Sequence, residues 1–158
     1  MTLDLTRGRD KANTTTIKRL EVTKSHKTLG VRLEPLGLFN DELDFLLAKA
    51  KRYATRLEAL SLGSYDSLTF YETLFLTGVG YSFPVVPLSF EAAKKLQIPM
   101  TKVLLNKISF NRNYPHAVTY GPLEFGGLGI PYIYMEQGIA KISLIMRHMS
   151  SNQEQSLT

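Results

Sequence analysis

The sequence predicts a mainly helical α+β fold, in which an N-terminal β-hairpin precedes a bundle of four to five helices. Apolar and polar residues alternate near the N-terminus, whereas apolar residues recur every three or four positions further along the chain. Of the 158 residues, 44% are hydrophobic and 21% are charged, which is enough to build one domain around a core. The expected organisation is a flexible tail (1–15), the hairpin (16–36), a helical domain (40–150) and a second flexible tail (151–158).

The hairpin is expected from two short runs of alternating residues. The run 16–22 alternates imperfectly, and the run 27–35 alternates well at Leu29, Val31 and Leu33. The polar segment 23–26 is expected to form the turn between them. Because an isolated hairpin is marginally stable in water, it should pack against another part of the protein.

A long amphipathic helix is expected to begin near Asn40 and to end before Gly63. Asn40 is the expected N-cap, acidic residues follow it, and basic residues lie towards the other end, as the helix dipole favours. The core-facing stripe has three- and four-residue spacing and comprises Leu43, Leu46, Leu47, Ala50, Tyr53, Ala54, Leu57 and Leu60.

Three further helical segments follow. The first, 64–80, is apolar around most of its circumference and is therefore expected in the middle of the bundle. The second begins after Ser89, its expected N-cap, and Pro99 should kink or split it because proline lacks the amide that the helix needs. Residues 109–129 should form a loop that includes at most one short strand. A last helix is expected from 131 to about 149, with Pro131 in its first turn.

The segment GPLEFGGLGIPYIYMEQGIAKI, residues 121–142, holds five glycines and two prolines. A phosphate-binding loop would need a Lys-Ser or Lys-Thr pair at the start of the helix, or the dinucleotide-binding spacing within a βαβ unit. Neither is present, and no lysine follows the glycines until Lys141. Tight turns that return the last helix to the domain are the favoured interpretation.

Several kinds of site find no support in the residues. The chain has no cysteine, which excludes disulfides and thiolate metal sites, and its histidines at 26, 116 and 148 are too far apart in sequence to indicate a ligand cluster. No catalytic residue, no metal and no cofactor are predicted. The N-terminus has acidic residues but no apolar core of a signal peptide, and the longest uncharged run, 73–90, is broken by glycines and prolines. We therefore expect an intracellular protein, nuclear or cytoplasmic, that is not secreted and has no membrane partner.

Three segments in order resemble one region of a known family: LGVRLEPLGLFNDELDFLLAKAKRYATRL, then VGYSFPVVPLSFEAAKKLQIPMTKVLLNKISFNRNYPHAVTYGPLEFGGLGIP, then EQGIAKISLIMRHM. Together they are similar to the region downstream of the polymerase core in reverse transcriptases of non-LTR-like retrotransposons. The resemblance spans roughly residues 27–149. It implies the end of the palm hairpin, a thumb and a connecting region, with a template–primer duplex as partner and the missing polymerase core as a second possible partner.

The chain departs from the complete enzyme in its acidic residues. Nucleotide addition needs aspartates that hold paired Mg²⁺ ions, and in the family these usually include a Tyr-x-Asp-Asp turn. The aspartates here are at 4, 10, 41, 44 and 66, and none stands in such a turn. We therefore expect no polymerase activity from this chain alone, and Mg²⁺ only in the palm of a full-length enzyme.

Two groups of basic residues are the candidate nucleic-acid-binding sites, in a chain whose net charge is +5. A thumb contacts the phosphate backbone more than base edges. The first group lies on the helix from 40 and comprises Lys49, Lys51, Arg52 and Arg56; the second comprises Lys102, Lys107, Arg112 and His116. Phe110 and Tyr114 lie among the second group as candidate stacking rings. The alternative interpretations are a solvated helix face that complements the dipole and aromatic rings folded onto the core.

Two other functions remain open. The chain is alternatively a helical module that binds another protein through its Tyr, Phe and Met side chains, or a non-functional relic of a mobile element. The sequence does not distinguish RNA from DNA as the ligand and does not indicate an oligomeric state.

Overall fold

The computed structural model describes residues 24–155, with side chains up to residue 150. The chain divides into two compact units, 1–38 and 39–158. In the first unit, β1 (His26–Thr28) and β2 (Val31–Leu33) form an antiparallel hairpin in which His26 lies opposite Leu33 and Thr28 opposite Val31.

The hairpin confirms the predicted fold class, but the predicted turn is wrong. His26 belongs to β1, and the chain turns at Leu29 and Gly30, inside the run expected to form one strand. Both turn residues have positive φ, 49° and 92°, the backbone that a two-residue hairpin turn needs and that glycine adopts readily. The expected strand 16–22 and the tail 1–15 lie outside the described residues.

The second unit is helical. α1 (Asn40–Ala59) confirms the predicted amphipathic helix and buries Leu46, Ala50, Ala54 and Leu57. The prediction that Asn40 caps it is wrong, because Asn40 is the first helical residue and Phe39 occupies the cap position without a side-chain hydrogen bond. The helix ends at Ala59, ahead of Gly63, where Leu60 takes an extended backbone conformation.

The segment 64–80 is one helical rod with a wider turn in its middle. It consists of α2 (Ser64–Phe70), the π-helical η1 (Tyr71–Leu76) and α3 (Thr77–Gly80), with right-handed helical backbone at both junctions. Tyr71, Phe75 and Val79 are fully buried, whereas Tyr65 and Leu74 are 80% and 50% exposed. The rod therefore buries one face only, and the predicted central position, with most of its circumference buried, is wrong.

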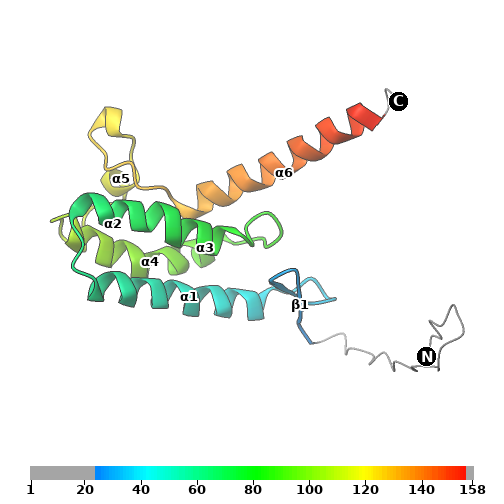
Figure 1. Ribbon diagram of the computed structural model, residues 1–158, viewed down its shortest axis with the longest axis horizontal. Helices are drawn as coiled ribbons and strands as arrows, with labels where there is room; N and C mark the ends of the chain where they lie inside the picture. Colours follow the sequence, from blue (N-terminus) through cyan, green and yellow to red (C-terminus); the bar gives the residue numbers. More distant parts are fainter. Residues whose placement is uncertain (1–23, 156–158) are drawn as a thin grey trace, which may run out of the picture. The chain divides into compact units, whose positions relative to one another are not determined.

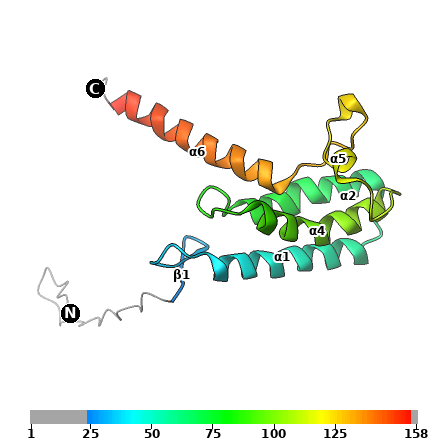
Figure 2. The same cartoon turned by 180° about the vertical axis from the view of Figure 1, so that it is seen from behind.

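α4 (Phe90–Lys107) follows an irregular segment that contains Pro84 and Pro87. Ser89 caps it as predicted, because its Oγ accepts a hydrogen bond of 3.2 Å from the Ala92 amide. Pro99 lies inside the helix without splitting it. α1 packs along α4, and α2 also contacts α4, so the three helices lie side by side (Figures 1 and 2).

The segment expected to hold a loop and a short strand instead forms α5 (His116–Thr119) and the 3-10 turn η2 (Leu123–Phe125). The tight turns predicted from the glycines are confirmed, since Gly126 and Gly129 have φ of 78° and 64°. The loop is closed by backbone hydrogen bonds from Leu128 to Val118 (2.8 Å) and from Ile130 to Thr119 (3.2 Å).

α6 (Ile133–Gln155) begins two residues after Pro131, so the placement of this proline in the first turn is wrong. The helix continues past the boundary expected at 150, and residues 156–158 of the expected C-terminal tail lie outside the described residues. Only the early turns of α6 lie beside the other helices, and the later turns extend away from them (Figures 1 and 2).

Two buried glutamines hold α6 in place. The Gln97 side chain accepts a hydrogen bond from the Ile133 amide (2.8 Å) and donates to the Pro131 carbonyl and the Tyr71 hydroxyl, both at 3.0 Å. The Tyr71 hydroxyl also donates to Pro131 (2.7 Å), and burial raises its pKa well above the usual value, which keeps it protonated.

Gln137 forms a second clamp from α6 itself. Its side chain accepts a hydrogen bond from the Leu88 amide (2.7 Å) and donates to the Leu88 carbonyl (3.3 Å). Because every bond is buried, these contacts fix the start of α6 on the segment that leads into α4.

Candidate nucleic-acid interface

Three of the four predicted basic residues of α1 gather around one small hollow. Lys49, Arg52, Tyr53 and Arg56 line a space of about 90 Å³. Their spacing of three and four residues places them on one side of the helix, beside the buried stripe. Arg52 and Arg56 are exposed, so both guanidinium groups are accessible to a ligand.

Lys49 lies deeper than the two arginines. Its ammonium donates a hydrogen bond to the carbonyl of Gly78 in α3. Burial, followed by the positive charge of Arg52, lowers the pKa of Lys49, while the Glu42 carboxylate opposes that shift. Lys49 therefore joins α1 to α3 and contributes positive charge at the floor of the hollow.

Lys51 is not part of this arrangement. Successive helical residues are about 100° apart around the axis, so Lys51 points well away from Lys49 and Arg56. It is exposed and does not line the hollow. The sequence already contained this distinction, because Lys49, Arg52 and Arg56 follow the helical repeat and Lys51 does not.

The second predicted group is also largely brought together. Lys102 of α4, Arg112 and Tyr114 of the connecting loop, and His116 of α5 line a hollow of about 240 Å³. Lys102, Arg112 and His116 are exposed, and Tyr114 is half-buried. The hollow therefore combines two permanent cations with aromatic rings, a composition that suits a phosphate next to a base.

Sequence reasoning missed Tyr120, which also lines this hollow. Its hydroxyl lies 3.2 Å from that of Thr101, and burial raises its pKa. The ring centroid of His116 is 5.7 Å from that of Tyr120 in an edge-on arrangement. Tyr120 therefore holds two other lining residues, Thr101 and His116, in position. Because Tyr120 and Lys102 do not share a helix or strand, no repeat connects them, and the sequence alone did not indicate Tyr120.

Phe110 and Tyr114, the candidate stacking rings, pack on one another. Their centroids are 4.9 Å apart with an interplanar angle of 62°, and both rings are half-buried. Tyr114 lines the hollow and Phe110 supports it from behind. A base could stack on the accessible part of Tyr114 while Phe110 keeps the ring oriented.

Lys107 has a different position from the other members of its group. Its ammonium donates to the carbonyls of Glu58 (3.2 Å) and Leu60 (2.6 Å) at the C-terminal end of α1. The last carbonyls of a helix have no partner within the helix, and a cation there also complements the dipole. Lys107 thus acts as a capping group for α1 from the end of α4.

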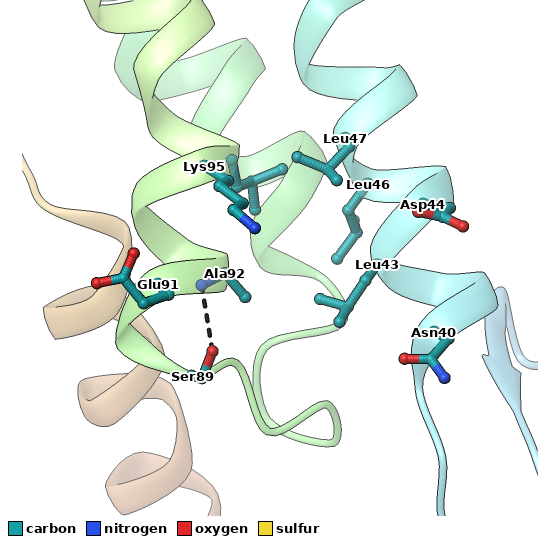
Figure 3. Close-up of a pocket in the computed structure, with 10 residues that line it drawn as sticks. Asn40, Leu43, Asp44, Leu46, Leu47, Ser89, Glu91, Ala92 and Lys95 are labelled. Carbon is teal, nitrogen blue, oxygen red and sulfur yellow. Dashed lines mark hydrogen bonds between the residues drawn. The ribbon is translucent and has the colours of Figure 1, made fainter.

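A third and larger groove lies between the N-terminal halves of α1 and α4. Its volume is about 380 Å³, and Figure 3 shows Leu43, Leu46 and Leu47 facing Ala92 and Lys95 across it. The side chains of Asp44 and Glu91 point outwards from it in the same view. The lining is mainly apolar and also includes Asp44, Glu91 and Lys95.

Within the described part of the chain, no three His, Asp or Glu side chains come together in a way that could hold a metal ion. Between residues 24 and 155, no helix has the length and apolar character to cross a membrane. No protein-family model, no curated protein and no solved structure matches this chain.

Proposed function

We propose that this chain binds the phosphate backbone of an RNA or DNA template–primer duplex, as the thumb and connecting region of a retroelement reverse transcriptase would. The observation that carries the proposal is the gathering of Lys49, Arg52 and Arg56 around one hollow on α1. In this role the chain positions a duplex and adds no nucleotides itself.

The chemistry of the α1 hollow suits phosphate. Arg52 and Arg56 are one helical turn apart, with about 5–6 Å between their Cβ atoms, so their side chains can reach the same phosphate or adjacent phosphates. A guanidinium offers paired donors that match phosphate oxygens. An arriving phosphate would also stabilise the protonated form of Lys49, whose pKa burial lowers.

The hollow that includes Lys102, Arg112 and Tyr114 supports the same function. Its cations can bind phosphate, and its rings offer a face for an unpaired base at the end of a duplex. Neither kind of contact reads the sequence of the nucleic acid, so binding should depend little on base sequence.

The test compares two neighbouring charge reversals, Arg52→Glu and Lys51→Glu, which change net charge equally. Fluorescence anisotropy with a labelled RNA–DNA duplex is measured over a range of salt concentrations. Arg52→Glu should weaken binding and reduce the slope of log K against log salt by about 1, since each phosphate contact contributes about 0.9. Lys51→Glu should leave the slope nearly unchanged.

Equal effects of the two reversals would mean that only net charge matters and would refute the assignment to the α1 hollow. Failure of the unmodified protein to bind any duplex at low salt would refute the function. Circular dichroism of both variants shows whether the fold is retained.

A further inference from the structure

The outward side of α6 carries a continuous row of exposed apolar side chains. Met135, Ile139, Ile142, Met146 and Met149 expose 62%, 56%, 59%, 66% and 66% of their surfaces. We call these five residues the outer stripe. Single exposed apolar residues are ordinary on protein surfaces, whereas a contiguous row of five along one helix indicates a binding surface.

The outer stripe lies on the side of α6 that faces away from the helical body. Ile133 and Gln137, which pack into the core, are about half a helical turn around the axis from the stripe. The later turns of α6 extend beyond the other helices in both views (Figures 1 and 2). A second helix can therefore approach the stripe without displacing any core contact.

The spacing of the stripe identifies the kind of surface it would fit. Its members are separated by four, three, four and three residues, which is the a and d pattern of helices that pair side by side. A helix that extends beyond its domain gains little stability from propensity alone and relies on packing of its apolar face. The outer stripe therefore fits another helix with the same repeat.

We propose that the outer stripe pairs with the outer stripe of a second copy of this chain, in antiparallel orientation. The charges beside the stripe support this orientation, because Glu136 and Arg147 lie along the same flank. In an antiparallel pair centred on Ile142, Glu136 of one copy lies within one residue of Arg147 of the other, and the symmetry creates this pairing twice. In a parallel pair this flank of one helix would face the opposite flank of the other, so Glu136 and Arg147 would not meet.

The expected dimer is weak. The stripe runs over 14 residue steps, about 21 Å of helix, which buries less than the roughly 800 Å² per partner of a standard interface. Association should therefore occur at micromolar or higher protein concentration and depend on it strongly.

Sedimentation velocity of the full chain, from about 1 to about 500 μM, tests the proposal over the range expected for a weak interface. The unmodified protein should pass from monomer to dimer. Ile142→Asp, at the centre of the stripe, should raise the dissociation constant at least about tenfold. Leu144→Asp is the matched control, because Leu144 is 50% exposed on the same helix but lies outside the stripe.

The orientation is tested with charge reversals. Glu136→Arg should weaken the dimer, and the double variant Glu136→Arg with Arg147→Glu should restore it. Loss without restoration would overturn the antiparallel arrangement. A protein that stays monomeric at every concentration, including one whose stripe binds lipid vesicles instead, would overturn self-association, as would equal effects of Ile142→Asp and Leu144→Asp.

Discussion

At the scale of single residues, Gln97 contributes more to this fold than its polarity would suggest. It is buried within α4, and both polar atoms of its side-chain amide form hydrogen bonds. The oxygen accepts from the Ile133 amide, and the nitrogen donates to the Pro131 carbonyl and the Tyr71 hydroxyl. A buried backbone group that loses its partner costs about 1–3 kcal/mol, so the bonds of Gln97 matter mainly through what their loss would leave unpaired.

Replacement of Gln97 by leucine should therefore destabilise the protein by roughly 2–4 kcal/mol, because the Ile133 amide loses its partner and the Pro131 carbonyl loses one of two donors. Urea unfolding followed by circular dichroism measures the change. Asn106→Leu is the control, because Asn106 is exposed on the same helix and its replacement should change stability by less than about 0.5 kcal/mol. Similar midpoints for the two variants would contradict the role of Gln97.

Lys107 provides a second residue-scale prediction. Its replacement by methionine should cost about 0.5–1.5 kcal/mol of stability, because two carbonyls at the end of α1 lose a charged donor. The salt dependence of duplex binding should change little, since the Lys107 ammonium already donates its hydrogen bonds to carbonyls of the protein itself. Lys102→Met should show the reverse, with nearly normal stability and a reduced salt slope.

At the scale of elements, the contact between α1 and α3 depends on a glycine. A Cβ atom built at Gly78 would lie 2.5 Å from the Tyr53 hydroxyl oxygen, and the Lys49 ammonium donates to the Gly78 carbonyl. The π-helical turn η1 precedes α3 and alters the direction in which its residues point. No periodicity in the sequence indicated that turn.

Gly78→Ala should accordingly destabilise the protein by about 1–3 kcal/mol through overpacking, although alanine is the better helix former. Tyr53→Phe, which removes the closest atom, should recover part of that loss in the double variant. Gly138→Ala is the control, because nothing lies within 4 Å of a Cβ at that position, and it should stabilise α6 by about 0.5–1 kcal/mol. Destabilisation of equal size at both glycines would contradict the packing argument.

The elements also show which parts of the fold the sequence could predict. α1 and α6 have long three- and four-residue repeats, and both helices were predicted, although α6 continues to residue 155 and not to about 149 as expected. The hairpin was misplaced because the alternation of Leu29, Val31 and Leu33 continues through the turn, and only Gly30 marks it. α5 and η2 are too short to produce a repeat, and their positions depend on long-range backbone hydrogen bonds.

The candidate site was partly predictable for the same reason. Grouping of Lys49, Arg52 and Arg56 follows from helical geometry, and so does the exclusion of Lys51. The roles of Lys107 and Tyr120 depend on how separate elements meet, because their partners are between 19 and 49 residues away in sequence. No local pattern carries that information.

At the scale of the whole molecule, different surfaces of the chain would bind different partners. Basic side chains around two hollows would bind phosphate, and the outer stripe of α6 would bind a second copy of the chain. The two interactions should respond differently to salt, because phosphate binding releases counterions and weakens with salt, whereas burial of apolar side chains does not.

The salt dependence of duplex binding by the unmodified protein tests the central claim most directly. If Arg52, Arg56, Lys102 and Arg112 each contact a phosphate, a plot of log K against log salt should have a slope of about −3.6. That slope should be similar for duplexes of different sequence. A slope near zero, or the absence of any duplex binding at low salt, would contradict the account.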